Sequence, residues 1–224
     1  YKIIKNCYNE GNVESNAYNA YAGGLVGKNE ANAYVQKSYN SGEIYAYGHF
    51  PKSGGICGHN CGDLEKVANI GIVSASENWN DKIGMSYIGG IAGWNDNIIS
   101  KANNAGKIID SNIGYIKDVG GICGHNRKTI ENVYNSSNIS ISCGYVGGII
   151  GDNYESGKLQ YAYNVGLITS KNDILDYSNN IVSNNNGNIQ YCYYLYDEKN
   201  IIDGAEKLSL TQMKTQSNYL GFDF

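Results

Sequence analysis

The heptapeptide Gly-Gly-Ile-Cys-Gly-His-Asn occurs twice in this chain, at Gly54–Asn60 and at Gly120–Asn126. A Cys and a His two positions apart are typical of a metal site, or of a nucleophile with its base. Related segments nevertheless recur along most of the chain, each with the Gly-Gly-apolar pattern or a degraded form of it. These segments begin 27 to 35 residues apart, at Gly23, Gly54, Gly89, Gly120, Gly147 and Asn179. The heptapeptide is therefore one unit of an internal repeat.

A second marker, Asn-x-Gly followed two positions later by Ile or Val, lies between successive copies, with Ser replacing Gly in one case. It begins at Asn9, Asn40, Asn69, Asn104, Asn135 and Asn164. The 224 residues include 29 Gly, 21 Tyr and one Pro, a composition that favours turns and strands over helices. A period near thirty residues in such a chain predicts a parallel β-solenoid of about six coils, each contributing two or three short stacked strands.

Stacked coils place equivalent residues in columns. The Asn residues of the two markers are expected to form two ladders of hydrogen-bonded amides. Cys57 and Cys123 share a column with Val and Ile residues, and Cys7 and Cys192 share another with Ala and Val, so all four are predicted to pack as small hydrophobes. Cys143 continues an apolar alternation and is also expected to point inward. The sequence does not decide whether Cys57 and Cys61 form a disulfide, because this bond requires a turn that brings the two Cα atoms close together.

Charge and hydropathy exclude some partners. The net charge is −4 with a pI near 5.4, and the Lys residues and the single Arg, Arg127, are scattered. Nucleic acid is therefore not an expected partner. No apolar run is long enough to span a bilayer. The chain begins at Tyr1 with neither Met nor a signal peptide, and we expect it to be a fragment of a longer protein.

Gly24-Leu25-Val26-Gly27, followed by Asn29 and later by Tyr39-Asn40-x-Gly, resembles the GLUG repeat, and the resemblance extends from about Cys7 to Tyr194. It implies a right-handed solenoid from a bacterial secreted or cell-surface protein. GLUG repeats occur in adhesin-like proteins and in non-catalytic regions of IgA1-specific metalloproteases. The resemblance assigns no catalytic residue or cofactor. The sixth copy departs from the pattern, because Asn179 and Asn180 replace both leading glycines, as is common in a terminal coil.

Catalytic and metal-binding interpretations have weak support. The three His residues form no zinc-protease motif, and a zinc site of Cys57, His59 and Cys61 lacks a fourth ligand. The His59 column also contains Lys28, Trp94 and Asp152, a freedom typical of a solvated position. Cys-His catalysis requires both side chains on one face, but Gly58 and Gly124 are candidate bulges that would separate them. Asp96, Asp152 and Glu155 are candidate Ca²⁺ ligands without supporting spacing. We therefore predict no enzyme activity, metal or cofactor.

Tyrosine is the most promising surface feature. One column is expected by strand alternation to point outward, although it breaks at Ala68 and Asn103; its members are Tyr8, Tyr39, Tyr134, Tyr163 and Tyr193. Exposed rings bind sugars and partner proteins, while the alternative is that they pack only on one another. The predicted ligand-binding residues are Tyr8, Tyr39, Tyr134, Tyr163 and Trp94.

The chain is divided into a solenoid, residues 1–195, and a C-terminal cap, residues 196–224. Ser209 is expected to N-cap a short helix over Leu210 to Gln216. Aromatic and aliphatic residues that follow the helix are expected to cover the open end of the core; they are Tyr219, Leu220, Phe222 and Phe224.

The sequence is compatible with three functions. The favoured one is adhesion of a bacterial surface module to a host or matrix protein or glycan, as one part of a larger chain. The alternatives are a passive stalk and, because polysaccharide lyases and hydrolases often use β-helices, a carbohydrate-active enzyme. An exposed aromatic patch favours adhesion, a carboxylate cluster on one face favours the enzyme, and uniformly polar faces favour the stalk.

Overall fold

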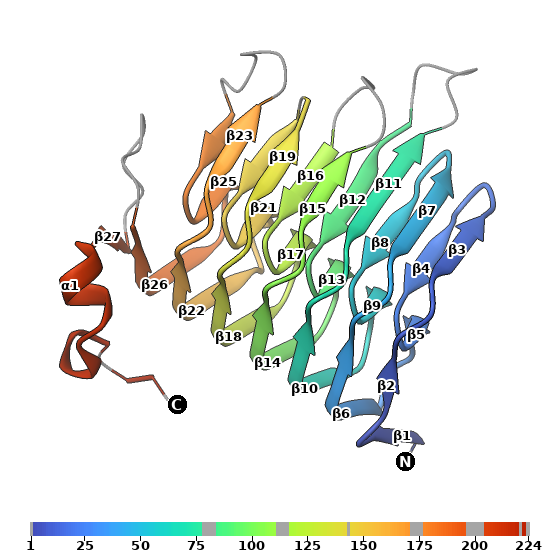
Figure 1. The fold of residues 1–224 in the computed structure, drawn as a ribbon, viewed down its shortest axis with the longest axis horizontal. Coiled ribbons are helices and arrows are strands. Elements are labelled where there is room, and N and C mark those ends of the chain that lie inside the picture. Colours follow the sequence, from blue (N-terminus) through green and yellow to red (C-terminus); the bar gives the residue numbers. More distant parts are fainter. Residues whose placement is uncertain are drawn as a thin grey trace.

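The chain folds into a parallel β-solenoid of about six turns, as predicted (Figure 1). The computed structural model describes residues 2–77, 84–110, 117–142, 144–170, 177–195, 204–219 and 221–222. Cys143, Leu220 and Phe224, which carry expectations above, lie outside these residues. None of the described helices is long and apolar enough to cross a membrane.

Each full coil contributes one strand to each of four parallel sheets, A to D, which run along the rod. Sheet A contains β1 (Lys2–Lys5), β2 (Tyr8–Asn9), β6 (Ala33–Asn40), β10 (Asp63–Asn69), β14 (Ile98–Asn104), β18 (Thr129–Asn135), β22 (Lys158–Asn164), β26 (Asn188–Tyr194) and β27 (Ala205–Lys207). Sheet B contains β3 (Val13–Asn16), β7 (Ile44–Gly48), β11 (Val73–Glu77), β15 (Ile108–Asp110), β19 (Ile139–Ile141) and β23 (Ile168–Ser170).

The other two sheets are built from the Gly-Gly repeat and the residues around it. Sheet C contains β4 (Tyr21–Gly23), β8 (Lys52–Gly54), β12 (Ser86–Gly89), β16 (Lys117–Gly120), β20 (Tyr145–Gly147) and β24 (Ser178–Asn179). Sheet D contains β5 (Val26–Asn29), β9 (Cys57–Asn60), β13 (Ala92–Asn95), β17 (Cys123–Asn126), β21 (Ile150–Asn153) and β25 (Val182–Asn185). Each full coil therefore has four strands, more than the two or three expected.

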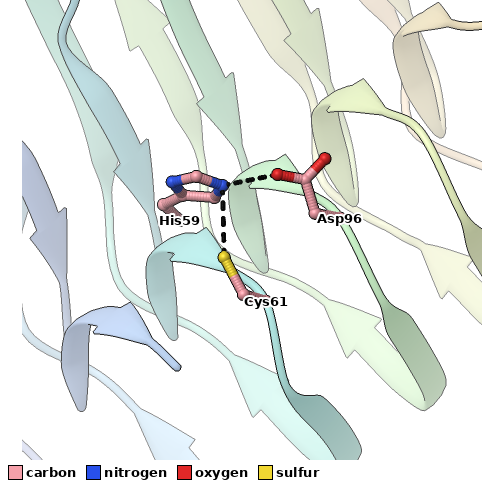
Figure 2. Close-up of side chains that lie close together, drawn as sticks. All are labelled: His59, Cys61 and Asp96. Atoms are coloured by element: carbon pink, nitrogen blue, oxygen red, sulfur yellow. Dashed lines mark hydrogen bonds and ion pairs between the residues drawn. The ribbon is translucent and has the colours of Figure 1, made fainter. Parts of the chain in front are cut away.

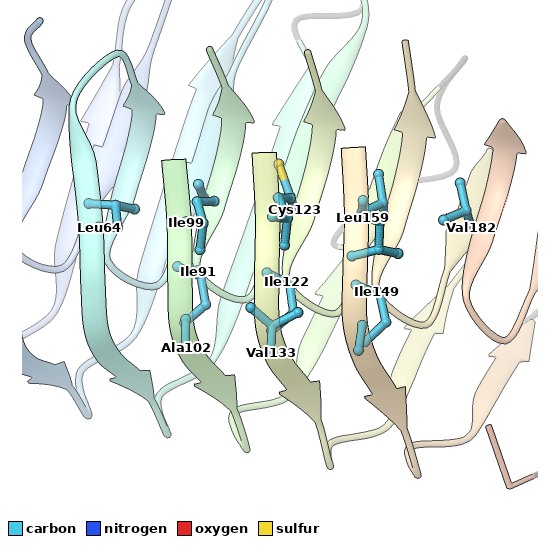
Figure 3. Packing of buried hydrophobic residues seen from close by; sticks show 14 of the residues in the cluster. Leu64, Ile91, Ile99, Ala102, Ile122, Cys123, Val133, Ile149, Leu159 and Val182 are labelled. Carbon is cyan, nitrogen blue, oxygen red and sulfur yellow. The ribbon is translucent and has the colours of Figure 1, made fainter. Parts of the chain in front are cut away.

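The interior contains two parallel hydrophobic cores. The larger core lies between sheets A and D, where Leu64 and Ile99 of sheet A meet Ile91, Cys123 and their equivalents (Figure 3). The smaller core lies between sheets B and C and is formed by the columns that include Ile44 and Ile88. Cys57, Cys123 and Cys192 are buried, as predicted, whereas Cys7 in the first coil is exposed. These four and Cys61 are free thiols, so no Cys57–Cys61 disulfide forms.

Both predicted Asn ladders are confirmed. Side-chain amides in the column from Asn9 to Asn164 bond from coil to coil at 2.8 to 3.0 Å. Those in the column from Asn29 to Asn185 bond at 2.8 to 2.9 Å. The first ladder lies against the glycine pairs of the C–D turn, because a Cβ atom added to Gly90 would meet the Asn104 Cγ at 2.3 Å. An amide column opposed by glycines thus separates the two cores.

Differences in coil length are accommodated between sheets B and C. Asn69 and Gly89 lie 20 positions apart, whereas Asn135 and Gly147 lie 12 apart. The strands on both sides of this connection nevertheless keep the same register through the stack. The B–C edge therefore takes up length changes that the cores do not.

The C-terminal segment differs from the prediction in two ways. Ser209 does N-cap a helix, with a capping box to Gln212, but α1 (Leu210–Met213) is shorter than expected and is followed by the 3₁₀ turn η1 (Gln216–Asn218). Tyr219 and Phe222 do not cover the open end of the core. They pack instead with Tyr193 in a separate cluster, because the outward tyrosine rings offer an apolar surface beside β27, which itself pairs with β26.

Candidate functional site

The tyrosine column forms two stacked pairs on the outer face of sheet A. The rings of Tyr8 and Tyr39 lie 5.4 Å apart at 10°, and those of Tyr134 and Tyr163 lie 5.0 Å apart at 3°. Tyr8 is 62% exposed and Tyr39 is 40% exposed. The outward direction predicted for these rings is therefore confirmed for Tyr8 and Tyr39.

The far end of the column is covered by the chain itself. Tyr219 lies 5.3 Å from the Tyr163 ring and 5.4 Å from the Tyr193 ring, and Phe222 contacts both. Tyr193 is only 7% exposed, contrary to the expected outward exposure. Burial raises the pKa of the Tyr163 phenol, with smaller effects from Tyr134 and Tyr219. Tyr163 is thus only partly available to a ligand.

A surface hollow of about 240 Å³ lies where the column is interrupted at Asn103. Its walls include the rings of Tyr134, Tyr163 and Phe222. The small side chain at the interruption leaves the Tyr134 ring open on one side. The break noted in the sequence is therefore a depression beside an aromatic ring.

A second set of side chains lies at the junction of sheets C and D, on the side away from the cores. We call it the C–D cluster; its members are Tyr21, Lys52, Tyr87 and Asp118 from sheet C, and His59, Trp94, His125 and Asp152 from sheet D. The two columns touch across the junction, with Tyr87 and Trp94 ring centroids 4.8 Å apart and Tyr21 and His59 centroids 5.7 Å apart. Trp94 therefore lies in this cluster and not beside the tyrosine column.

Glycine at the second position of five sheet D strands creates this arrangement, while Ser183 takes that position in β25 of the last coil. A Cβ atom on Gly58 would lie 2.9 Å from the backbone oxygen of Lys52, so only glycine permits the close approach of sheets C and D. Cys57 and Asn60 face inward, while His59 emerges on the opposite side. Cys57 and His59 are therefore separated, although the strands keep a one-to-one register through the glycine and show no bulge.

Lys28 at the start of the His59 column is exposed, but the later members are partly or fully buried, contrary to the solvated position expected from the mixed composition. His125 is only 9% exposed because the Trp94 indole stacks on its ring at 4.0 Å, while Tyr87 approaches its edge. The mixed residue types are explained by pairing across the junction with a different sheet C residue in each coil.

Lys52 is enclosed by three aromatic rings. Its Nζ lies 5.0 Å from the Tyr21 ring centroid, 5.2 Å from that of Tyr87 and 5.3 Å from that of Trp94. Burial lowers the pKa of this ammonium, and the negative charge of Asp96 opposes the shift. Cation–π attraction compensates part of the lost hydration.

Among the residues that the structure describes, two groups of potential metal ligands lie in or beside the C–D cluster. In the first, His59 Nε2 lies 2.8 Å from Asp96 Oδ2 and 3.5 Å from Cys61 Sγ (Figure 2). The sequence suggested Cys57, His59 and Cys61 as ligands, but Cys57 lies in the core, and Asp96 takes its place beside His59 and Cys61. Burial lowers the pKa of His59, and the hydrogen bond that its ring makes to the Asp96 carboxylate opposes this shift.

The second group consists of Asp118, His125 and Asp152. His125 Nδ1 lies 3.2 Å from Asp118 Oδ2 and 2.8 Å from Asp152 Oδ2. Burial raises the pKa of Asp118 to about 6, although the hydrogen bond with His125 acts in the opposite direction. Burial lowers the pKa of His125, but the two carboxylates outweigh it, and the net shift is upward.

The predicted Ca²⁺ ligands do not come together as one site. Asp96 belongs to the His59 group and Asp152 to the His125 group, while Glu155 is exposed in the turn after β21. Sequence reasoning also missed the sheet C half of the cluster. Its signal was present, because the position two residues before the start of each repeat copy is Tyr or a charged residue in all six copies: Tyr21, Lys52, Tyr87, Asp118, Tyr145 and Tyr177.

No protein-family model, characterised protein or solved structure matches this chain. The fold nevertheless defines the class: the chain is a parallel β-solenoid repeat protein. The resemblance to GLUG repeats rests on the residues quoted above.

Proposed function

We propose that this chain is a non-catalytic binding module of a bacterial secreted or cell-surface protein, and that it adheres to a host or matrix protein through the outer tyrosine column. The supporting observation is that the chain's own C-terminal segment packs on this column, where Tyr219 and Phe222 contact Tyr163 and Tyr193. A surface that holds aromatic side chains of its own chain is suited to hold those of another polypeptide. The GLUG resemblance supports the extracellular location.

The free part of the column has the properties that such a contact needs. Tyr8 and Tyr39 offer parallel, exposed rings, and Tyr134 borders the hollow at the column break. Tyrosine supplies a large apolar area with a hydroxyl that can still hydrogen-bond, and aromatic residues are enriched at interfaces for this reason. A glycan, which also stacks on flat rings, is the other ligand class that the test includes.

The test is saturable binding of the recombinant chain to immobilised matrix proteins and to a glycan array. We expect Tyr39→Ser combined with Tyr134→Ser to weaken binding at least about tenfold, since interface aromatics typically contribute more than about 1 kcal/mol each. The matched control is Tyr177→Ser, because Tyr177 is 63% exposed but belongs to the sheet C column and not to the tyrosine column of sheet A. Binding that survives the double substitution, or is lost equally in the control, contradicts the proposal. Failure of the intact chain to bind either class favours the stalk.

A carbohydrate-active enzyme is the second candidate, because the C–D cluster and its border bring the carboxylates Asp96, Asp118 and Asp152 to one face of the rod. It ranks lower because the Asp118 side chain is only 1% exposed and contacts His125, so that it does not reach a substrate in this conformation. Release of reducing or unsaturated sugars from polysaccharides, abolished by Asp152→Asn, would favour the enzyme over the adhesin.

A further inference from the structure

We propose that Asp118, His125 and Asp152 form a binding site for a divalent transition-metal ion of the zinc class. This site belongs to the C–D cluster and is independent of the binding role proposed for the tyrosine column. Nothing in the repeat pattern requires it, because the equivalent positions in other coils are Tyr or Lys in sheet C and Lys, His, Trp or Asn in sheet D.

The distances suit a metal ion. The three potential ligand atoms all lie within 4.8 Å of one another, and His125 Nδ1 lies 2.8 and 3.2 Å from the two carboxylate oxygens. A tetrahedral ion with bonds of about 2.0–2.2 Å places its ligand atoms about 3.3 Å apart. The two His125 distances differ from this value by only a few tenths of an ångström. One nitrogen can donate only one proton, so it cannot fully satisfy both carboxylates at once.

An independent observation points to a missing partner. Asp118 Oδ1 is buried and has no hydrogen-bond partner, and the side chain as a whole is only 1% exposed. A buried carboxylate with an unsatisfied oxygen is unfavourable unless a charge or donor compensates it. A bound cation would offset the negative charge of both carboxylates.

The surrounding residues hold the three ligands in place. Asn184 donates a hydrogen bond to Asp152 Oδ1 at 2.6 Å, which leaves Oδ2 turned toward His125. The Trp94 indole stacks on the imidazole at 4.0 Å and 27°. The ligands themselves lie on β16, β17 and β21, which belong to consecutive coils with fixed register. Such outer contacts commonly orient metal ligands and tune their affinity.

The ligand types indicate which ions fit. One imidazole nitrogen with two carboxylate oxygens suits Zn²⁺, Mn²⁺ or Co²⁺, whereas Ca²⁺ takes six to eight oxygens and Mg²⁺ keeps several waters. Three protein ligands leave a position for water or for a group from a partner. The sister group around His59 is the weaker candidate, because the Arg127 guanidinium lies 3.7 Å from Asp96 Oδ1 and repels a cation.

The experiment is calorimetric titration of the tag-free recombinant chain with Zn²⁺, together with absorption spectroscopy after Co²⁺ addition. We expect one equivalent to bind, with a Kd weakened at least tenfold by Asp152→Asn and by Asp118→Asn. Cys61→Ser is the matched control and should leave the Kd unchanged, and the Co²⁺ spectrum should lack a thiolate charge-transfer band. Asp152 is partly exposed, so its variant keeps the test valid even where Asp118→Asn fails to fold; circular dichroism checks both.

Three outcomes would overturn the site. The first is no saturable binding of Zn²⁺, Mn²⁺ or Co²⁺ up to about 1 mM, which corresponds to a negligible affinity. The second is a thiolate band that disappears in Cys61→Ser together with binding, which would place the ion at His59, Cys61 and Asp96. The third is unchanged affinity in a folded Asp152→Asn variant.

Discussion

Replacing Asn104 by Ala should interrupt the amide ladder at a fully enclosed point. The Asn104 Nδ2 donates to Gly106 O at 2.9 Å and to Asn135 Oδ1 at 3.0 Å. Its Oδ1 accepts from Gly106 N at 3.1 Å and from Asn69 Nδ2 at 2.9 Å. Asn104 has no exposed surface, so water cannot replace these bonds. Four hydrogen bonds at about 1 kcal/mol each give an expected loss of about 4 kcal/mol in the free energy of unfolding.

Asn9→Ala is the matched control at the end of the same ladder. Asn9 bonds to Gly11 and Asn40 in the same pattern, but in partly exposed surroundings, where water can take over and the expected loss is about 1 kcal/mol or less. Urea denaturation followed by circular dichroism measures both variants, and hydrogen exchange at Gly71 and Gly106 shows whether the damage is local. A loss below about 1 kcal/mol for Asn104→Ala would refute the view that the ladder stabilises the rod.

Three further predictions concern other parts of the fold. Gly90→Ala should lower the free energy of unfolding by at least about 2 kcal/mol, because the new Cβ would lie 2.2 Å from the Gly121 carbonyl oxygen. The control Gly11→Ala should be nearly neutral, because its Cβ would lie 3.7 Å from the nearest atom. Urea denaturation measures both. Lys117→Met should cost about 3–5 kcal/mol at pH 7 in a thermal unfolding assay, because it removes the buried ammonium 2.8 Å from Asp110 Oδ2. Burial raises the pKa of Asp110 but its bonds to Lys117 and Ser142 outweigh that and lower it. The stability that the Lys117–Asp110 pair contributes is present above the ordinary carboxyl pKa and is lost as pH falls through the lowered pKa of Asp110. A wild-type chain whose stability does not fall in this acid range would contradict a stabilising role for the pair. Among the described cysteines, a thiol reagent should label only Cys7 and Cys61 without denaturant. Burial raises the pKa of Cys57 and Cys192 to about 12, and Cys123 is also buried with a raised pKa. Labelling of Cys57, Cys123 or Cys192 without denaturant would disprove the packing.

The repeat columns could be predicted because their chemistry is visible in single residue types. Asn at fixed spacing indicated the ladders, and Cys57 alternating with Val, Ala and Ile indicated a core position. The backbone was less accessible. Sheet A strands bend at one residue per coil with positive φ, among them Lys66 at 54° and Tyr161 at 55°. Lys and Tyr do not favour positive φ, so tertiary packing imposes it at these positions and it cannot be predicted from the local sequence.

The candidate metal group was missed for a different reason. Asp118 lies seven positions before His125 and 34 before Asp152, and only the bend at Gly120 and Gly121 brings sheet C over sheet D. Columns within one sheet can be aligned from the sequence, but contacts between two sheets require the angle of the turn that joins them. The predicted solvation of the His59 column failed for the same reason, since Trp94 and Tyr87 meet across that turn.

The connections between sheets B and C tolerate changes in length, while the four sheets keep the same geometry from coil to coil. Eight additional positions between Asn69 and Gly89, relative to Asn135 and Gly147, leave the stacking of neighbouring coils unchanged. The entropic cost of a longer connection grows only slowly with its length. A foreign peptide inserted after Glu77 should therefore be carried on the rod without unfolding it, and several such inserts would be displayed in a row, one coil apart.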